Sequence, residues 1–151
     1  NVTGVQTCAL PIWAAAALKA EYTLPGISQS VVITRMAGRT PVPEKESIRS
    51  FAAHQATMVL FLSTGMLEKL SEELVAGGYQ EETPAAIVYK ATWPEEKVMH
   101  CTVGTLAETA EREKVTKTAL IVVGNVLNTE YERSKLYDPA FTTEFRKGKE
   151  V

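Results

Sequence analysis

The residues best suited to chemistry lie in the segment Leu24–Glu44, LPGISQSVVITRMAGRTPVPE. Arg35 and Arg39 are set around Gly38 directly after a β-branched run, and two prolines follow them. Proline fixes its own φ and restricts the residue before it, so this loop presents its charges in a limited set of positions. Two guanidinium groups beside a sheet suit a ligand with several carboxylates. A solvated basic turn that only joins a strand to a helix is the alternative, and these residues alone favour neither.

The first residues look foreign to the rest of the chain. Val2–Ile12, VTGVQTCALPI, resembles the in-frame translation of a widely used sequencing-adapter oligonucleotide. Like a tag, such a segment is excluded from reasoning about the fold. We therefore expect residues 1–13 to be a non-native leader and residues 14–151 to be the C-terminal part of a longer protein.

The composition excludes several classes of function. A hydrophobic content of 45% and a charged content of 23% are ordinary for a soluble globular domain. The net charge of −2 gives no basic excess for nucleic acid, and the apolar stretch Trp13–Leu18 is far too short to cross a bilayer. Outside the suspected leader Cys101 is the one cysteine, which permits no internal disulfide. We expect a cytoplasmic protein with neither nucleic-acid nor membrane partners.

Helix and strand signals alternate along the chain, and the buried strands are short apolar runs such as TMVLFL and ALIVV. The predicted helices are Ala14–Ala20, Glu44–Ala53, 65–76, Leu106–Val115 and a short one near Glu130–Lys135, and the predicted strands are Ser30–Thr34, Thr57–Leu62, Ala85–Tyr89, Lys97–Val103 and Ala119–Val123.

This order predicts an α/β fold with a mixed, mostly parallel sheet flanked by helices. The connection between Ala85–Tyr89 and Lys97–Val103 is too short for a crossover helix, so this pair is the expected antiparallel element. In such sheets ligands usually bind outside the carboxyl ends of the parallel strands. The places to look are the segments that follow three buried strands: Leu62-Ser63-Thr64, Ala91-Thr92 and Gly124-Asn125.

Five segments carry a resemblance to a known family: the arginine-containing segment above, FAAHQATMVLFLS from Phe51, YKATWPEE from Tyr89, ALIVVGN from Ala119 and SKLYDPAFTTEFRKG from Ser134. Together they resemble the C-terminal domain of the tetrapyrrole methylase family. TRMAGRTPVPE is typical of the subgroup that methylates precorrin-4 or cobalt-precorrin-4 at ring carbon 11.

The resemblance implies methyl transfer from S-adenosylmethionine to a tetrapyrrole in cobalamin biosynthesis. Members of the family are two-domain homodimers that bind the cofactor between the domains. The glycine-rich loops that hold its methionine end lie in an N-terminal half that this chain lacks, so we expect at most half a site here. By position in the motifs, the implied cofactor-binding residues are Leu62, Ser63, Ala91, Thr92 and Gly124.

The transfer asks little of side chains, because a sulfonium methyl group is already activated and the enzyme mainly aligns it and excludes water. We therefore assign no catalytic residue and expect no metal. Arg35, Arg39 and Glu44 are the predicted substrate-binding residues, and Trp93 either shields the cofactor or only covers its own loop. Two alternatives stay open: a sister enzyme that methylates another ring position, and a non-catalytic α/β binding or dimerisation module.

Overall fold

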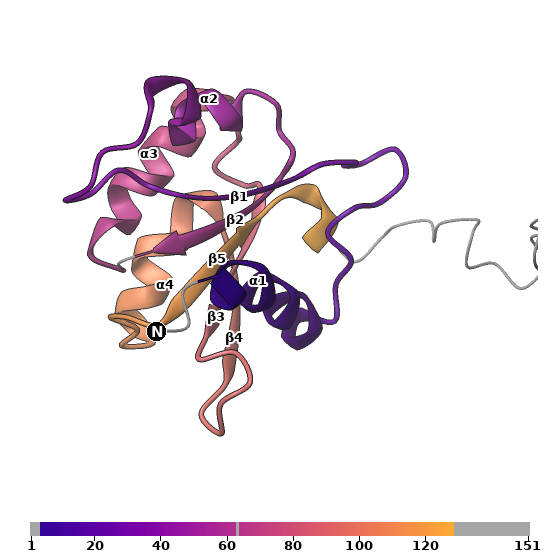
Figure 1. Ribbon diagram of the computed structural model, residues 1–151, viewed down its shortest axis with the longest axis vertical. Helices are drawn as coiled ribbons and strands as arrows, with labels where there is room; N and C mark the ends of the chain where they lie inside the picture. The colour runs from indigo at the N-terminus through magenta and orange to yellow at the C-terminus, as the bar shows by residue number, and fades with distance from the viewer. Residues whose placement is uncertain (1–3, 63, 129–151) are drawn as a thin grey trace, which may run out of the picture.

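Five strands form a single sheet in the computed structural model, which describes residues 4–62 and 64–128 (Figure 1). Each strand agrees within one residue at either end with a strand predicted above. The sheet order is β1-β2-β5-β3-β4, so β5 is central although it follows the other four in the chain. The strands are β1 (Val31–Arg35), β2 (Thr57–Leu62), β3 (Pro84–Tyr89), β4 (Lys97–Thr102) and β5 (Ala119–Val123).

The directions of the strands differ from the expectation. Strands β1 and β2 are parallel, whereas β5 is antiparallel to both β2 and β3, and β4 is antiparallel to β3. The α/β class with a mixed sheet and flanking helices is confirmed, but parallel pairs do not dominate the sheet. The physical reason lies between β4 and β5, because a crossover through a helix brings the chain back in the direction in which it left. Strand β5 therefore runs in the same direction as β4. Because β4 is antiparallel to β3, β5 is antiparallel to β3 as well.

Helices cover the two faces of the sheet unequally. Of the helices in the described residues, α2 (Ile48–Ala52), α3 (Leu67–Gly77) and α4 (Leu106–Arg112) pack on one face, and α1 (Gly4–Leu18) lies across the other (Figure 1). Successive strand residues point to opposite faces. Accordingly, Met58 and Leu60 of β2 join the core under the three helices, whereas Val59 joins the smaller cluster under α1.

The predicted helix Glu44–Ala53 is interrupted. A 3-10 turn covers Glu44–Glu46, and α2 begins only at Ile48. Ser47 separates the two with an extended backbone, and its side chain accepts a hydrogen bond from the backbone N–H of Ser50 at 3.2 Å. Serine competes for backbone donors in this way, which makes it a better N-cap than a helix interior residue.

The N-terminal helix extends into the predicted leader, and the last part of the chain lies outside the described residues. Helix α1 includes Gly4–Ile12 and ends at Leu18, two residues before the end of the predicted helix Ala14–Ala20, and the foreign origin of the leader stays a prediction. The predicted helix near Glu130–Lys135 and the motif from Ser134 lie outside the described residues. No helix in the described ranges is long and apolar enough to cross a membrane.

Candidate functional site

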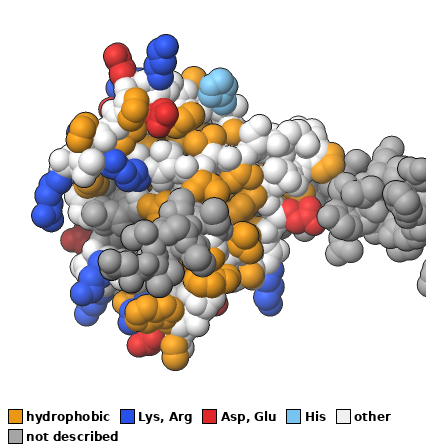
Figure 2. Space-filling view, in the orientation of Figure 1, with side chains coloured by type: hydrophobic (Ala, Val, Ile, Leu, Met, Phe, Trp, Pro, Cys, Tyr) orange, Lys and Arg blue, Asp and Glu red, His pale blue; other side chains and the backbone are white. Residues whose placement is uncertain are grey.

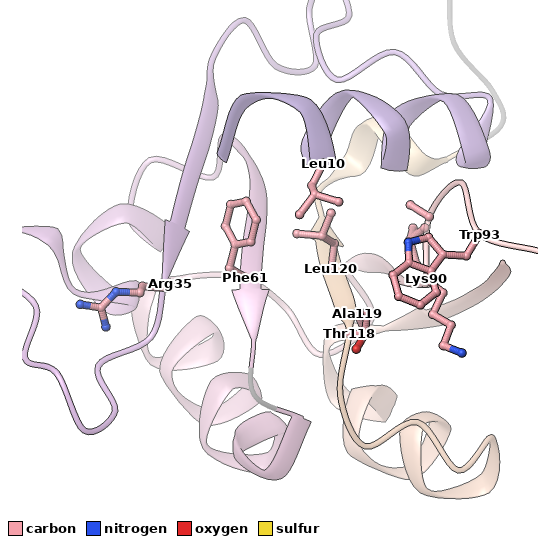
Figure 3. A pocket seen from close by; sticks show the side chains of 10 residues that line it. Leu10, Arg35, Phe61, Lys90, Trp93, Thr118, Ala119 and Leu120 are labelled. Carbon is pink, nitrogen blue, oxygen red and sulfur yellow. The ribbon is translucent and has the colours of Figure 1, made fainter. Parts of the chain in front are cut away.

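A cavity of about 380 Å³ opens at the edge of the sheet where β2 and β3 end and β5 begins (Figure 3). Apolar side chains from all three strands line it, namely Phe61, Val88 and Leu120, and Leu10 of α1 covers one side. The register explains this location. Ala119 pairs with the last residues of both neighbouring strands, so the start of β5 lies between their ends.

The turn from Lys90 to Glu96 forms one rim of the cavity. Ala91 is buried against the cavity, whereas the indole of Trp93 lines it while remaining 53% exposed. Backbone hydrogen bonds close the turn, from Trp93 N–H to the Lys90 carbonyl and from Glu96 N–H to the Trp93 carbonyl, both at 2.9 Å. The large aromatic side chain is therefore held at the mouth of the cavity.

The charge of Lys90 is compensated within the same turn. Its Nζ lies 3.3 Å from a carboxylate oxygen of Glu95 and sits over the rings of Tyr89 and Trp93, at 5.4 and 5.3 Å from their centroids. Desolvation acts to lower the pKa of Lys90, but the hydrogen bond and charge of Glu95 outweigh it and hold that pKa above its usual value. The rim holds one lysine and two glutamates, Glu95 and Glu96, so it carries no net positive charge.

Two threonines at this edge have left-handed backbones. Thr92 has φ +72° and Thr118, which lines the cavity, has φ +60°. Such values are unusual for β-branched residues, and strain of this kind costs about 1–3 kcal/mol and tends to gather at ligand sites. Neighbouring hydrogen bonds hold the conformation: Lys90 N–H donates to the Thr118 carbonyl at 2.9 Å, and Thr92 N–H donates to Glu96 Oε2 at 2.6 Å.

A second cavity of about 430 Å³ adjoins the first and is basic. Arg35 and Phe61 line both, so the two hollows meet at the end of β1 and β2. Residues of the loop after β1, including Gly38 and Arg39, form the rest of its wall together with Met66.

The structure brings together some of the predicted site residues. Ala91 and Arg35 line the first cavity and Arg39 lines the second. Leu62 ends β2 at the same edge, and Ser63 lies outside the described residues. Thr92 is exposed in the turn and belongs to neither lining, and its N–H donates to Glu96 Oε2.

Glu44 stands apart from both cavities. It begins the 3-10 turn before α2 and is exposed. Within residues 4–62 and 64–128 its carboxylate forms no ion pair with Arg35 or Arg39. Its role in binding substrate stays a prediction.

Gly124 lies apart from the first cavity, and its role in binding the cofactor stays a prediction. Because β5 is antiparallel to β2 and β3, its carboxyl end lies at the opposite edge of the sheet from the cavity. There Gly124 N–H donates to the carbonyl of Pro84, the first residue of β3, at 3.0 Å. This glycine has φ +148° and lies against Thr57, so the backbone itself requires glycine here.

The residues of the first cavity that sequence reasoning missed are Leu10, Phe61, Val88, Lys90, Thr118, Ala119 and Leu120. Three of them lie at the start of β5, where a parallel strand would have had no part in the site. The signal was present in the sequence, since a tight β3–β4 connection followed by a helical crossover fixes the direction of β5.

Metal and thiol chemistry find little support in the described part of the chain. No group of three His, Cys, Asp or Glu side chains there could hold a metal ion. Burial raises the pKa of the Cys101 thiol to about 11, so that group is protonated at neutral pH and a poor nucleophile.

Residues 10–107 match the model of a family described as Tetrapyrrole (Corrin/Porphyrin) Methylases. The chain belongs to this family. The matched range includes β1 to β4 and the rim of the first cavity. The tetrapyrrole methylase resemblance drawn from five segments of the sequence is thereby confirmed.

Several tetrapyrrole methylases are similar over most of this chain. The cobalt-precorrin-4 C(11)-methyltransferase of Methanocaldococcus jannaschii is 53% identical over 135 residues, which cover 89% of this chain and 52% of that protein. The enzyme of the same name from Priestia megaterium is 45% identical, with 89% and 54% covered. The precorrin-4 C(11)-methyltransferase of Mycobacterium tuberculosis is 42% identical, with 84% and 51% covered. The chain spans about half the length of the curated relatives it matches.

Solved tetrapyrrole methylase structures share the fold. A cobalt precorrin-4 methyltransferase superposes with a TM-score of 0.75 at 43% identity, over 78% of this chain and 49% of that one. A uroporphyrin-III C-methyltransferase from Thermus thermophilus, complexed with S-adenosylhomocysteine, gives a TM-score of 0.59 at 23% identity, over 78% and 51%. The second likeness shows the fold alone.

Proposed function

We propose that this chain forms one wall of the site of an S-adenosylmethionine-dependent methyltransferase that methylates precorrin-4 or cobalt-precorrin-4 at ring carbon 11 in cobalamin biosynthesis. The observation that carries the proposal is the 53% identity, over 135 residues, to a cobalt-precorrin-4 C(11)-methyltransferase. The cavity at the end of β2 and β3 supports it, because an apolar hollow at strand ends is a usual place for a cofactor.

The first cavity fits the adenosyl part of the cofactor. Its volume of about 380 Å³ lies in the range typical of ligand pockets, roughly 300–1,000 Å³. Phe61 and Leu120 offer flat apolar surface to an adenine ring, and the small side chains of Ala91 and Ala119 let the backbone approach it. Bound there, S-adenosylmethionine would supply an activated methyl group on a positively charged sulfur. Leu62, Ser63 and Thr92 remain predicted neighbours.

The charges around this cavity suit a positively charged cofactor. A cation in the wall would repel a sulfonium unless its charge were balanced or directed away. Lys90 is paired with Glu95, and the guanidinium of Arg35 points away from Phe61 and Leu120 (Figure 3). The chain's own contribution to catalysis is then to orient the cofactor and to exclude water, and Trp93 at the mouth is placed to exclude it.

The second cavity suits the carboxylates of a tetrapyrrole. Arg35 and Arg39 lie in its wall, and guanidinium groups are well matched to carboxylates. The two cavities share Arg35 and Phe61, which would bring a macrocycle bound in one close to a methyl donor bound in the other. Glu44 completes the set of predicted substrate-binding residues.

We further propose that the chain works joined to an N-terminal domain that carries the glycine-rich loops, as a cytoplasmic homodimer. Two observations support a further domain: the chain spans about half of its relatives, and the apolar face on which α1 lies is only partly covered (Figure 2). Exposed Ile33 and Trp13 belong to the apolar surface that a second domain or subunit could bury.

The test is a chimaera in which residues 14–151 replace the matching half of the Methanocaldococcus jannaschii enzyme. We expect it to transfer one methyl group from S-adenosylmethionine to cobalt-precorrin-4, measured by mass spectrometry and located at carbon 11 by NMR. Ala91→Leu, which fills the first cavity, should raise the Kd for S-adenosylhomocysteine at least about tenfold, equivalent to about 1.4 kcal/mol. The matched control Asn125→Ala, exposed at the opposite edge, should leave that Kd unchanged.

Each alternative predicts a different result. Methylation at another ring carbon would identify a sister enzyme instead. A folded chimaera that binds neither S-adenosylhomocysteine nor the tetrapyrrole would favour a non-catalytic module.

A further inference from the structure

We propose that the two arginines of the loop after β1 have different roles in one site. Arg39 binds the carboxylates of the substrate, and Arg35 is the positioning residue that holds the loop in place. This inference rests on the proposed function, since it states how the same site takes an anionic macrocycle. It replaces the expectation that both guanidinium groups bind the ligand in the same way.

The guanidinium of Arg35 is already occupied by its own loop. Nη1 donates to the carbonyls of Met36 and Thr40, at 3.3 and 3.1 Å, and Nη2 donates to the carbonyl of Pro41 at 3.1 Å. Guanidinium has five N–H donors in a rigid fork. Both donors of Nη1 and one of Nη2 are therefore used to fix the backbone from residue 36 to residue 41.

Further contacts hold the loop on both sides. The side chain of Met36 is buried in the core under α2 and α3, which anchors the start of the loop. Gly38 N–H donates to the Thr40 carbonyl at 3.3 Å, so this carbonyl accepts from both Gly38 and Arg35. The tip of the loop, Gly38-Arg39, is thereby closed into a tight turn over the second cavity.

Arg39 is placed differently at that tip. Its side chain is exposed and lines the second cavity, and within the described ranges it makes no hydrogen bond or ion pair. An arginine held only through its backbone can give all of its donors to a ligand, including two in parallel to one carboxylate.

The position of Arg35 links this anion site to the cofactor cavity. It is the last residue of β1, pairs with Phe61 of β2 in the sheet, and lines both cavities. The loop that presents Arg39 is thus fixed to the strand pair that forms the cofactor wall. Methyl transfer depends on such a fixed relation, because a small misplacement of the reacting atoms is costly in rate.

The test measures binding of uroporphyrin I, a tetrapyrrole with eight carboxylates, to the 151-residue chain by absorbance titration. A porphyrin with cationic substituents serves as the probe without carboxylates. The variants are Arg39→Ala, Arg39→Lys, Arg35→Lys and the double variant Arg35→Lys/Arg39→Ala. Gly38→Ala is the matched loop control, because the nearest atom to an added Cβ is Met66 Sδ at 3.9 Å.

We expect Arg39→Ala to weaken uroporphyrin binding about tenfold, the loss of one charge-assisted contact. Arg39→Lys should stay within about threefold of the unaltered chain, because the positive charge is kept. Arg35→Lys also keeps its charge, but a compact ammonium group does not reproduce the planar fork that spans the three carbonyls, and we expect about a fivefold loss. The double variant should bind no more than about twofold more weakly than Arg39→Ala, since without Arg39 there is nothing left to position.

The remaining outcomes overturn the inference in distinguishable ways. If Arg35→Lys binds like the unaltered chain, or if the two losses multiply to about fiftyfold, the arginines act independently; the inference fails and the proposed function stands. If Arg35→Lys also lowers the melting temperature or Gly38→Ala weakens binding equally, Arg35 has only a general structural role. If the chain prefers the cationic porphyrin, both the inference and the proposed substrate site fail, whereas the chimaera still tests methyl transfer by itself.

Discussion

The two ends of the sheet, defined by the termini of β2, β3 and β5, differ in structure. At one end, where β2 and β3 finish and β5 starts, two cavities open, Trp93 is exposed and two threonines have left-handed backbones. At the other end, where β2 and β3 start and β5 finishes, the buried polar groups around Thr57 and Tyr79 are paired, and the hollow of about 480 Å³ found there lies to the side, at the start of β1.

Thr57 shows how the closed end is made. This residue is fully buried, yet its Oγ1 donates to the Tyr22 carbonyl at 2.6 Å and its N–H donates to the Ser28 hydroxyl at 3.0 Å. Nearby, the hydroxyl of Tyr79 donates to the Ala56 carbonyl. Buried polar groups that are satisfied in this way stabilise a single arrangement.

The difference teaches where stability and function are separated in this fold. Substitutions at the closed end should lower the free energy of unfolding and leave ligand binding alone. Substitutions at the open end should change ligand binding and have little effect on the free energy of unfolding. Four substitutions test this separation, from the largest expected change in the free energy of unfolding to the smallest.

The largest effect is expected for Gly77→Ala at the end of α3. An added Cβ would collide with the Cβ of Ala52 and lie 2.7 Å from the Arg49 carbonyl oxygen, both in α2. Overpacking of this kind should lower the free energy of unfolding by about 2–3 kcal/mol, measured by urea denaturation. Gly65→Ala at the open end, where nothing lies within 4 Å of an added Cβ, should stay within about 0.5 kcal/mol. Equal losses of unfolding free energy in the two variants would contradict the difference between the two ends of the sheet.

Gly124→Ala should lower the free energy of unfolding by about 1–2 kcal/mol, because alanine at φ +148° is strained and its Cβ would lie 3.3 Å from Thr57 Cα. The same change in the chimaera should leave the Kd for S-adenosylhomocysteine unchanged. Loss of cofactor affinity without loss of stability would support the cofactor role that the sequence suggested for Gly124.

Tyr79→Phe should cost about 1 kcal/mol at neutral pH, the net value of one hydrogen bond. Burial also raises the pKa of Tyr79 to about 12 from its ordinary value of 10.0. The folded state therefore favours the protonated phenol, and the resulting stability is complete below about pH 10 and is lost as the pH rises towards about 12. Chemical denaturation between these pH values should show a shallower loss for the variant. A pH profile identical to that of the unaltered chain would contradict a protonated, buried Tyr79.

The smallest effect, and the only gain, is expected for Thr118→Gly at the open end. Glycine accepts φ +60° without strain, which should slightly exceed its entropic cost and raise the free energy of unfolding by about 0.5 kcal/mol. Thr116→Gly, exposed two residues earlier without a positive φ, should lower it by a similar amount. Thermal melts of the two variants compare them directly, and a loss in both would mean that Thr118 is not strained.

The positions of the strands were predicted correctly from the sequence, whereas the direction of β5 was not. Runs such as TMVLFL are apolar at every position after the first, which identifies a strand buried on both faces, and Met58, Val59 and Leu60 are all fully buried. Apolar content is the same for either direction of a strand. The direction of β5 had to come from the connections, and assuming parallel order placed Gly124 at the wrong end.

Candidate site residues that belong to a sequence motif could be predicted, whereas residues that only the fold brings together could not. The loop motif led to Arg35 and Arg39, and both line the basic cavity. Nothing in the order of residues shows that the guanidinium of Arg35 turns back onto its own loop. Likewise, Phe61 and Thr118 are 57 positions apart in the chain and meet only because β2 and β5 are neighbours in the sheet.

The central place of β5 also shapes how the chain acquires its fold. Until Ala119–Val123 leaves the ribosome, β2 and β3 each present an open edge with unpaired backbone groups, and no sheet joins the two halves of the molecule. Release of that one segment closes both edges at once. Nascent chains stalled before this segment should therefore be prone to aggregation and sensitive to proteases. Chains that extend past it should become protease-resistant in a single step.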